Sequence, residues 1–257
     1  MKDERPVSQL SYQLYSSRKF GPIGETLKML AETGYSQVEG YGALYASLDD
    51  LDGLVGHLHA NSLNMATAHV GLDMLETDSA RFLEIARAVG LETAFVPHLA
   101  ADLRPDSAAG WQAFGARLAA AGGPLRDAGL MFGWHNHNFE YVPLEDGSLP
   151  MDHILEGGPN LAFEFDGAWC VRAGGDPMPV IERHGDRIVS AHVKDIAPTG
   201  EKTDEDGWAD VGEGTMDWRA IMAALGETGC KYFVMEHDNP SDDVRFAKAS
   251  HAFISGL

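Results

Sequence analysis

The sequence contains few cysteines and few basic residues. Cys170 and Cys230 are the only two cysteines among 257 residues, and they do not form a CxxC pair, so neither a disulfide framework nor a thiolate zinc site is indicated. Lys and Arg number 19 against 39 Asp and Glu, which gives a formal net charge of -20. Such a charge would repel a phosphate backbone or an anionic membrane surface. We therefore expect neither nucleic acid nor a membrane as a partner.

The sequence also lacks a long apolar run. No stretch approaches the length that crosses a bilayer, and the first ten residues, MKDERPVSQL, contain no apolar core of a secretory signal. No Pro/Ser-rich linker or low-complexity tract divides the chain. These absences predict a cytoplasmic protein with a single domain that covers residues 1–257.

Short apolar runs alternate with helix-patterned segments along the chain, which predicts an α/β fold with parallel strands. The length is typical of one (β/α)8 TIM barrel, and the hydrophobic content of 44% suffices for a full core. The predicted strands number eight, as a closed barrel requires, and comprise residues 9–14, 37–39, 64–69, 93–97, 130–136, 161–166, 188–193 and 232–236. Helices are predicted at residues 23–33, 48–61, 79–89, 107–128, 178–184 and 218–227. The sequence therefore predicts a (β/α)8 TIM barrel.

An open, doubly wound sheet would produce the same alternation of strands and helices. That fold would place a glycine-rich phosphate-binding signature after its first strand, whereas residues 16–24 read SSRKFGPIG. The barrel is therefore preferred. Residues 197–217 form the longest stretch without periodicity, and we expect this polar loop to cover part of the barrel mouth.

Four short segments place metal-binding residue types at the ends of predicted strands. They are WHNHNFE at 134–140, FEFD at 163–166, SAHVKD at 190–195 and FVMEHD at 233–238. Because the carboxyl ends of all strands in a parallel barrel meet at one mouth, these residues should surround one site. Carboxylates and an imidazole form a mostly hard set of ligands, which suits Mn, Mg, Co or Zn ions.

The alternation of a strand indicates which of these side chains point into the barrel. His135 and His137 share one face, although a pair of buried structural histidines would do the same. Asp166 is nearer the mouth than Glu164, which could be an internal salt-bridge partner or pair with Lys194. A lysine on an inner face needs an anionic or polar partner.

Five motifs carry a resemblance to a known family. They are HNHNFE (135–140), FDGAWCVRAGGDP (165–177), HVKD (192–195), DVGEGTMDW (210–218) and MEHDNP (235–240). In order and spacing they resemble the xylose-isomerase-like TIM barrel superfamily, the sugar phosphate isomerases/epimerases that also include the type 2 AP endonuclease fold. The resemblance rests on the second half of the chain, because the first half is similar only in general pattern.

The resemblance implies a divalent metal ion (Mn, Mg, Co or Zn) as cofactor. Its ligands in this chain would be Glu140, Asp166, His192 and Glu236. Some relatives place the first glutamate earlier on the strand, where this chain has histidines, so one of the two histidines of HNHNFE could replace or join Glu140. The resemblance also implies substrate-binding residues around the metal, namely His135, Trp169, Lys194, His69 and His98.

The implied activity is isomerisation or epimerisation of a sugar or keto-sugar, by metal-assisted proton transfer beside a carbonyl. Glu140, Glu236 and His137 are the expected catalytic groups. The alternative is a metal-dependent lyase or dehydratase acting on a keto-sugar, keto-inositol or oxidised glycoside. Cleavage of DNA at abasic sites would require a basic surface, and a sugar-binding barrel without activity is a further alternative. We expect a small-molecule carbohydrate as partner, and the sequence is compatible with a homo-oligomer.

Overall fold

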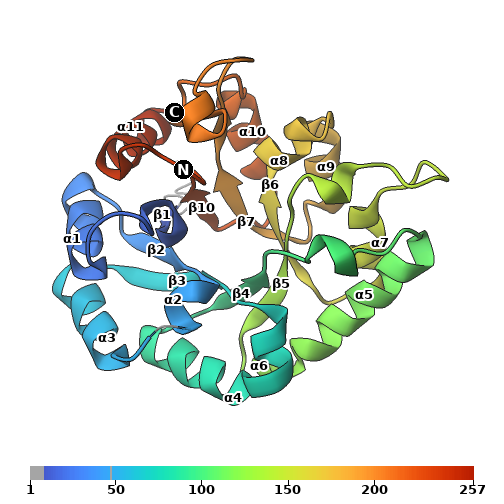
Figure 1. Ribbon diagram of the computed structural model, residues 1–257, viewed down its shortest axis with the longest axis horizontal. Helices are drawn as coiled ribbons and strands as arrows, with labels where there is room; N and C mark the ends of the chain where they lie inside the picture. Colours follow the sequence, from blue (N-terminus) through green and yellow to red (C-terminus); the bar gives the residue numbers. More distant parts are fainter. Residues whose placement is uncertain (1–8, 47) are drawn as a thin grey trace, which may run out of the picture.

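Eight parallel strands close into a barrel in the computed structural model, which describes residues 9–46 and 48–257 (Figure 1). Their order around the barrel is β1-β10-β7-β6-β5-β4-β3-β2. The strands are β1 (Gln9–Gln13), β2 (Gln37–Gly40), β3 (Asn64–His69), β4 (Thr93–Val96), β5 (Met131–His135), β6 (Ala162–Asp166), β7 (Ile188–Val193) and β10 (Tyr232–Met235). Neighbouring strands follow one another along the chain, and the barrel closes between β1 and β10. The predicted (β/α)8 TIM barrel, in a single domain, is confirmed.

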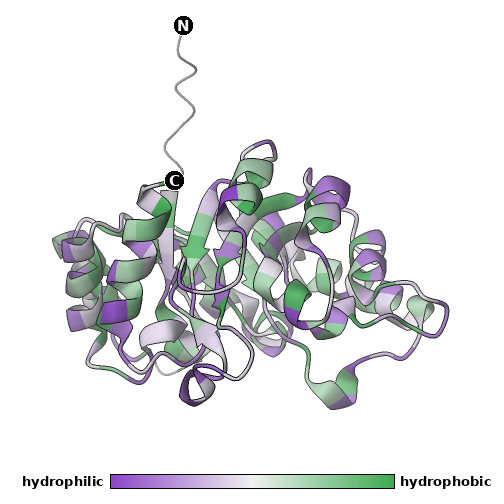
Figure 2. Ribbon diagram, turned by 90° about the horizontal axis from the view of Figure 1, so that it is seen from above, coloured by the Kyte–Doolittle hydropathy of each residue, from purple (hydrophilic) through white to green (hydrophobic). Residues whose placement is uncertain are grey.

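Helices surround the barrel on its outside (Figure 1). They are α1 (Ile23–Thr33), α2 (Gly42–Ala46), α3 (Leu51–Ala60), α4 (Leu72–Val89), α5 (Ala108–Ala121), α6 (Gly123–Asp127), α7 (Pro150–Gly157), α8 (Gly167–Arg172), α9 (Pro177–His184), α10 (Trp218–Leu225) and α11 (Asp243–Ser255). Two of them end at a glycine in the left-handed conformation, Gly34 with φ 113° and Gly90 with φ 75°. Figure 2 shows hydrophobic residues on the barrel strands and a mixture of hydrophobic and hydrophilic residues on the helices.

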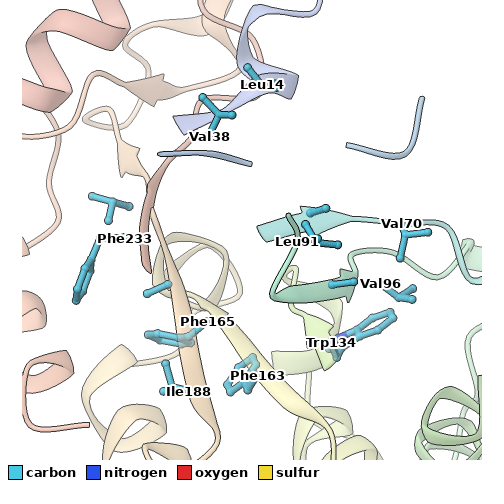
Figure 3. Close-up of a cluster of buried hydrophobic side chains, with 14 of the residues drawn as sticks. Leu14, Val38, Val70, Leu91, Val96, Trp134, Phe163, Phe165, Ile188 and Phe233 are labelled. Atoms are coloured by element: carbon cyan, nitrogen blue, oxygen red, sulfur yellow. The ribbon is translucent and has the colours of Figure 1, made fainter. Parts of the chain in front are cut away.

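The side chains of β6 show how the strands separate the two sides of the barrel wall. Phe163 and Phe165 belong to the buried apolar cluster drawn in Figure 3, and Phe163 packs edge-on against His184 of α9. Glu164 and Asp166 alternate with them and are also fully buried. Because successive residues of a strand point to opposite faces, the aromatic rings pack against the helices and the carboxylates enter the barrel. The apolar core therefore lies between strands and helices, and the barrel mouth is polar.

Several predicted boundaries differ from those in the structure. The predicted helix at 79–89 is the second part of α4, whose backbone breaks at Asp78 with φ -149° and ψ 54°. The predicted helix at 107–128 is divided into α5 and α6 at Gly122. The short helices α2, α7 and α8 and the last helix, α11, were not predicted. The loop at 197–217 contains the turn η4 (Thr203–Glu205) and strand β9 (Trp208–Ala209), which pairs antiparallel with β8 (Asp195–Ile196).

No helix within residues 9–46 and 48–257 combines the length and the apolar character that crossing a bilayer needs.

Candidate active site

Four buried side chains from β3, β5, β6 and β7 meet inside the barrel. His69, His135, Glu164 and His192, which we call the inner cluster, have ligand atoms within 4.8 Å of one another. Oε2 of Glu164 lies 2.6 Å from Nε2 of His69, 3.2 Å from Nδ1 of His135 and 3.3 Å from Nε2 of His192. Three imidazoles and a carboxylate form a set of donors that could hold a divalent metal ion.

Three further polar contacts complete the inner cluster. Oε1 of Glu164 accepts a hydrogen bond from the hydroxyl of Ser190 at 2.7 Å. Oε1 of Glu39, on β2, lies 2.8 Å from Nε2 of His192 and accepts a bond from Nε2 of Gln13 at 2.7 Å. Glu39 therefore holds the same nitrogen of His192 that faces Glu164.

Burial and charge act in opposite directions on the carboxyls of the inner cluster. Burial would raise the pKa of Glu164, but the charges of His192 and His69 and its hydrogen bonds outweigh burial and hold the pKa well below the ordinary value. Burial and the nearby Glu164 raise the pKa of Glu39. The two carboxyls lie around the same imidazoles, so the ionisation of each depends on the charge of the other.

A second group lies nearer the mouth, and His192 belongs to both groups. Asp166, His192 and Glu236, which we call the outer cluster, also have ligand atoms within 4.8 Å of one another. Nδ1 of His192 lies 3.0 Å from Oε2 of Glu236 and 4.0 Å from Oδ2 of Asp166. The two nitrogens of one imidazole thus face different clusters. Burial would lower the pKa of His192, but the surrounding carboxylates, with Glu164 the largest contributor, raise it well above the ordinary value.

Asp166 has two oxygens with different environments. Oδ1 accepts a hydrogen bond from the backbone N–H of Trp169 at 3.0 Å and so caps the start of α8. Oδ2 is buried and has no hydrogen-bond partner among residues 9–46 and 48–257. Burial raises the pKa of Asp166 to about 6, against the opposing charge of Lys194. A buried carboxylate oxygen without a partner is unfavourable unless a cation or a donor approaches it.

Lys194 is fully buried beside the outer cluster. Its Nζ lies 2.7 Å from Asp238, 2.8 Å from Glu236 and 3.9 Å from Asp166. Burial would lower the pKa of this ammonium, but the carboxylates outweigh burial and raise it. Lys194 is therefore charged and pairs with the outer carboxylates, and the suggestion that it pairs with Glu164 was wrong.

The loop at 197–217 covers one side of Lys194. Trp208, from β9, is buried and lies edge-on to Trp169, with ring centroids 4.8 Å apart. The Lys194 ammonium is 4.4 Å from the ring centroid of Trp208, and the guanidinium of Arg172 lies 3.2 Å from the same centroid. The ring of Trp208 therefore contacts both Arg172 and Lys194 on this side of the mouth.

Glu140 is placed apart from both clusters. It lies in the turn η3 (Phe139–Tyr141), directly after β5. Its Oε1 accepts a hydrogen bond from Nε1 of Trp134 at 2.8 Å, and its Oε2 accepts one from the backbone N–H of His137 at 2.9 Å. Burial raises the pKa of Glu140 to about 8. The structure thus brings together three of the four predicted ligands, whereas both oxygens of Glu140 are bonded within its own segment.

A cavity of about 290 Å³ borders both clusters. Its lining includes two carboxylates, two tyrosines and four histidines. These are Glu236 and Asp238, Tyr15 and Tyr41, and His69, His98, His135 and His137. Two further residues predicted to bind substrate, Trp169 and Lys194, lie beside this wall: the ring of Trp169 is 5.1 Å from that of His137. A larger groove of about 680 Å³ between α9 and α10 contains no residue of either cluster.

His137 is a buried imidazole at the wall of the cavity. Burial, with His135 as the next largest cause, lowers the pKa of His137 well below its ordinary value, so the ring is neutral. Its Nδ1 is buried and has no hydrogen-bond partner. A neutral imidazole with an unpartnered nitrogen at a cavity wall can accept or donate a proton.

Sequence reasoning missed Glu39, Gln13 and the two cavity tyrosines. Glu39 ends the predicted strand at 37–39, and Gln13 ends β1. The rule that residues at the carboxyl ends of strands meet at one mouth would have found both. The histidine-rich motifs that indicate the site lie in the second half of the chain, whereas Glu39 and Gln13 lie in the first. Tyr15 and Tyr41 follow the first two strands, and a lone tyrosine in a loop gives no signal of its own.

The chain is similar in sequence to one known family and to a curated relative. The family described as xylose isomerase-like TIM barrel matches residues 27–255. A curated relative, the rhizopine catabolism protein MocC of Rhizobium meliloti, is 25% identical over 158 residues, which are 55% of this chain and 48% of that protein. The chain thus matches about half the length of that relative.

Solved structures resemble the chain over nearly its whole length. A sugar phosphate isomerase/epimerase from Parabacteroides distasonis superimposes with a TM-score of 0.81 at 18% identity, covering 99% of this chain and 96% of that one. The IOLI protein, solved with a bound zinc atom, gives 0.78 at 14% identity, with 96% and 97% covered. The probable 3-DHS dehydratase AsbF from Bacillus anthracis gives 0.74 at 14% identity, with 96% and 98% covered. At these identities the likeness shows the fold alone.

Proposed function

Because this chain belongs to the xylose isomerase-like TIM barrel family, we propose that it is a metal-dependent isomerase or epimerase of a sugar or keto-sugar. It would move a proton between carbons beside a carbonyl group. The observation that carries the proposal is the position of His192. One of its nitrogens faces Asp166 and Glu236 next to a cavity, and the other is held by Glu39.

The residues of the outer cluster fit a divalent cation. Asp166 offers a buried oxygen without a partner, and Glu236 and Nδ1 of His192 complete a set of two carboxylates and an imidazole. The carboxylate of Glu39 on the far nitrogen matches the usual support of a metal-binding histidine. When bound there, a divalent cation would polarise a substrate carbonyl and stabilise the negative charge that develops on its oxygen.

The inner cluster is the competing position for the ion. Its single carboxylate, Glu164, already accepts a hydrogen bond from Ser190 and contacts three imidazoles. Both oxygens of Glu164 therefore have partners without an ion, although Nδ1 of His135 lacks a hydrogen bond within the described residues, whereas the outer cluster leaves a carboxylate oxygen, Oδ2 of Asp166, without one. On this ground we assign the metal to the outer cluster and the inner cluster to holding His192 in place.

Proton transfer is assigned to residues that reach the cavity. His137 and Glu236 line it, and His137 is neutral with a free nitrogen. Lys194 and His192 hold the pKa of Glu236 well below its ordinary value against the effect of burial, so this carboxyl is ionised. Both groups can therefore accept a proton. Glu140 does not line the cavity, and its raised pKa of about 8 reflects burial in the turn after β5.

Exchange of substrate protons with solvent tests the proposal. The metal-loaded protein is incubated in deuterium oxide with a panel of ketoses, aldoses and cyclic polyol ketones, and carbon-bound deuterium is followed by NMR. We expect deuterium beside the carbonyl of one class, together with an isomerised or epimerised product. Asp166→Asn and Glu236→Gln should abolish exchange, whereas the exposed control variant Glu145→Gln should retain it. Binding of a sugar by the loaded protein without any exchange would contradict the proposal.

A lyase or dehydratase is the second candidate. The rings of His98 and His137 lie edge-to-face at the cavity, with centroids 5.7 Å apart. One of them could donate a proton to a departing hydroxyl after the first proton is removed. The same NMR experiment separates the two reactions, because loss of water or of an aglycone gives a product of different composition.

A further inference from the structure

The side chains that line the cavity indicate the charge of the substrate, which the proposed function leaves open. We infer that the site takes an uncharged polyhydroxylated substrate whose terminal hydroxyls are free, rather than a phosphate ester. This inference rests on the proposed function and deepens it. The carboxylates Glu236 and Asp238 on the wall are the first observation behind it.

The charged side chains that line the cavity are of one sign. Asp238 is the more open of the two carboxylates, with 25% of its side chain exposed against 7% for Glu236. Within residues 9–46 and 48–257, no Lys or Arg lines this cavity. A phosphate dianion placed beside Asp238, which is not one of the proposed metal ligands, would meet a like charge, and such a juxtaposition costs several kcal/mol. A hydroxyl group would instead donate a hydrogen bond to this carboxylate.

The cations nearest the cavity already have partners. The guanidinium of Arg18 lies 3.6 Å from the ring centroid of Tyr15 and donates to the carbonyl oxygen of Tyr15 at 2.8 Å. Arg104 lies 3.6 Å from the ring centroid of Phe139 and donates to the carbonyl oxygen of Leu99 at 2.9 Å. Arg104 also contacts Nε2 of His98 at 3.2 Å, so a phosphate that reached either guanidinium would have to compete with contacts already made.

Lys194 is the cation nearest the outer cluster, and it is the least accessible. It has no exposed surface, and its ammonium lies 2.7 Å from Asp238 and 2.8 Å from Glu236. A phosphate could reach it only by displacing one of these carboxylates, which would leave a buried charge unpaired. The lysine is therefore held by these carboxylates and is not available to bind an anion.

The remaining surface of the cavity suits an uncharged ring or chain. Tyr15 and Tyr41 lie edge-to-face with centroids 5.7 Å apart, and they offer an apolar surface next to polar groups. His98 and His137 on the wall can each donate and accept hydrogen bonds to hydroxyls. The cavity of about 290 Å³ is at the small end of ligand sites, which run from about 300 to 1,000 Å³. The wall therefore matches a small polyol in size and in chemistry.

Matched pairs of substrates test the inference. The metal-loaded protein is given D-fructose and D-fructose 6-phosphate, D-xylulose and its 5-phosphate, and a cyclic polyol ketone and its phosphate ester. Binding is measured by calorimetry, and deuterium exchange by NMR. We expect the neutral member of at least one pair to bind about tenfold or more tightly than its ester, as like-charge repulsion requires. Tighter binding of the esters would overturn the inference, as would the absence of neutral-sugar binding.

The two proposals can fail separately in this experiment. Exchange on phosphate esters with little exchange on neutral sugars would support the isomerase and overturn the charge assignment. Binding of neutral sugars without exchange would support the charge assignment and contradict the isomerase. Asp238→Asn should narrow the preference for neutral ligands, because it removes the more exposed carboxylate. The exposed variant Asp127→Asn is the matched control, and circular dichroism reports whether each variant folds.

Discussion

Nε2 of His192 lies 2.8 Å from Oε1 of Glu39, which directs the other nitrogen of the same ring toward the mouth of the barrel. The two residues are 153 positions apart in the sequence, and both are fully buried. The contact fixes the orientation of the imidazole before any ligand arrives.

Replacing Glu39 by Gln should weaken metal binding without removing a ligand. Supporting residues of this kind typically contribute about 10- to 100-fold to metal affinity. We expect a loss of that size in competition with a chromophoric chelator, and a changed absorption spectrum when cobalt is bound. Glu32→Gln, at a surface glutamate of α1 that is 69% exposed, is the control. Equal affinity of the Glu39 variant and the wild type would show that His192 does not depend on this contact.

The two clusters should respond differently to loss of one charge each. Asp166→Asn keeps the oxygen that accepts the N–H of Trp169, so the protein should fold normally and lose most of its metal. Glu164→Gln leaves three imidazoles facing a neutral amide, and breaking a buried charge network of this kind costs about 3–5 kcal/mol of unfolding free energy. Metal content by plasma emission and urea unfolding distinguish the two effects. If Asp166→Asn binds metal normally and Glu164→Gln does not, the ion belongs to the inner cluster.

Arg245 should hold the loop over the mouth to the last helix. It donates to Asp210 at 2.8 Å and to Glu205 at 2.7 Å, and both carboxylates are nearly fully buried. Arg245→Met should lower the free energy of unfolding by about 3 kcal/mol, because the buried Asp210 loses its cationic partner and Glu205 keeps only Lys202 and the N–H of Ser241. Arg81→Met, which breaks an exposed pair with Glu84, should cost less than about 1 kcal/mol. Similar costs in urea titrations of the two variants would contradict the assignment.

Acid should loosen the same attachment. Burial would raise the pKa of Glu205, but hydrogen bonds from Ser241 and Arg245 outweigh burial and lower it to about 2. A group with a lowered pKa in the folded state contributes stability above its unfolded pKa, near 4.3, and loses it as the pH falls toward 2. We expect this carboxyl to account for roughly 2 kcal/mol of the loss across that range. Glu205→Gln should be less stable at neutral pH and should show a correspondingly weaker dependence on pH in unfolding titrations.

His137 should affect turnover more than binding. His137→Gln keeps a hydrogen-bonding side chain of similar size at the cavity wall but cannot take up a proton at neutral pH. Loss of a general base typically lowers kcat by about 10²- to 10⁴-fold. We expect the deuterium exchange rate to fall by that amount with little change in ligand affinity. A variant that loses affinity instead, with exchange intact, would make His137 a binding residue only.

The barrel could be predicted from the sequence because each strand is a short apolar run followed by polar residues. Asp166, His192 and Glu236 could be predicted for the same reason, since the carboxyl end of a strand fixes where they point. Glu140 differs because it lies three residues beyond His137, in a turn whose hydrogen bonds depend on Trp134. No periodic pattern extends into such a turn. The helix α8 was missed because it begins directly after β6 and is six residues long.

Glu39 shows a different limit of prediction. It is the third residue of a fully buried strand of four, so its position indicates the mouth of the barrel, but nothing in the letters QVEG marks it as functional. Its role depends on His192, which reaches it only through closure of the barrel. A contact between the second strand and the seventh has no local signal in the sequence.

Asp166 joins two tasks in one side chain, since one oxygen starts α8 and the other faces the outer cluster. The helix that begins there carries Trp169, whose ring borders the cavity. A movement of this carboxylate toward an ion would alter the hydrogen bond that starts the helix and, through it, the position of the indole. We therefore expect the fluorescence of Trp169 to change when the centre is occupied, even before a sugar is added.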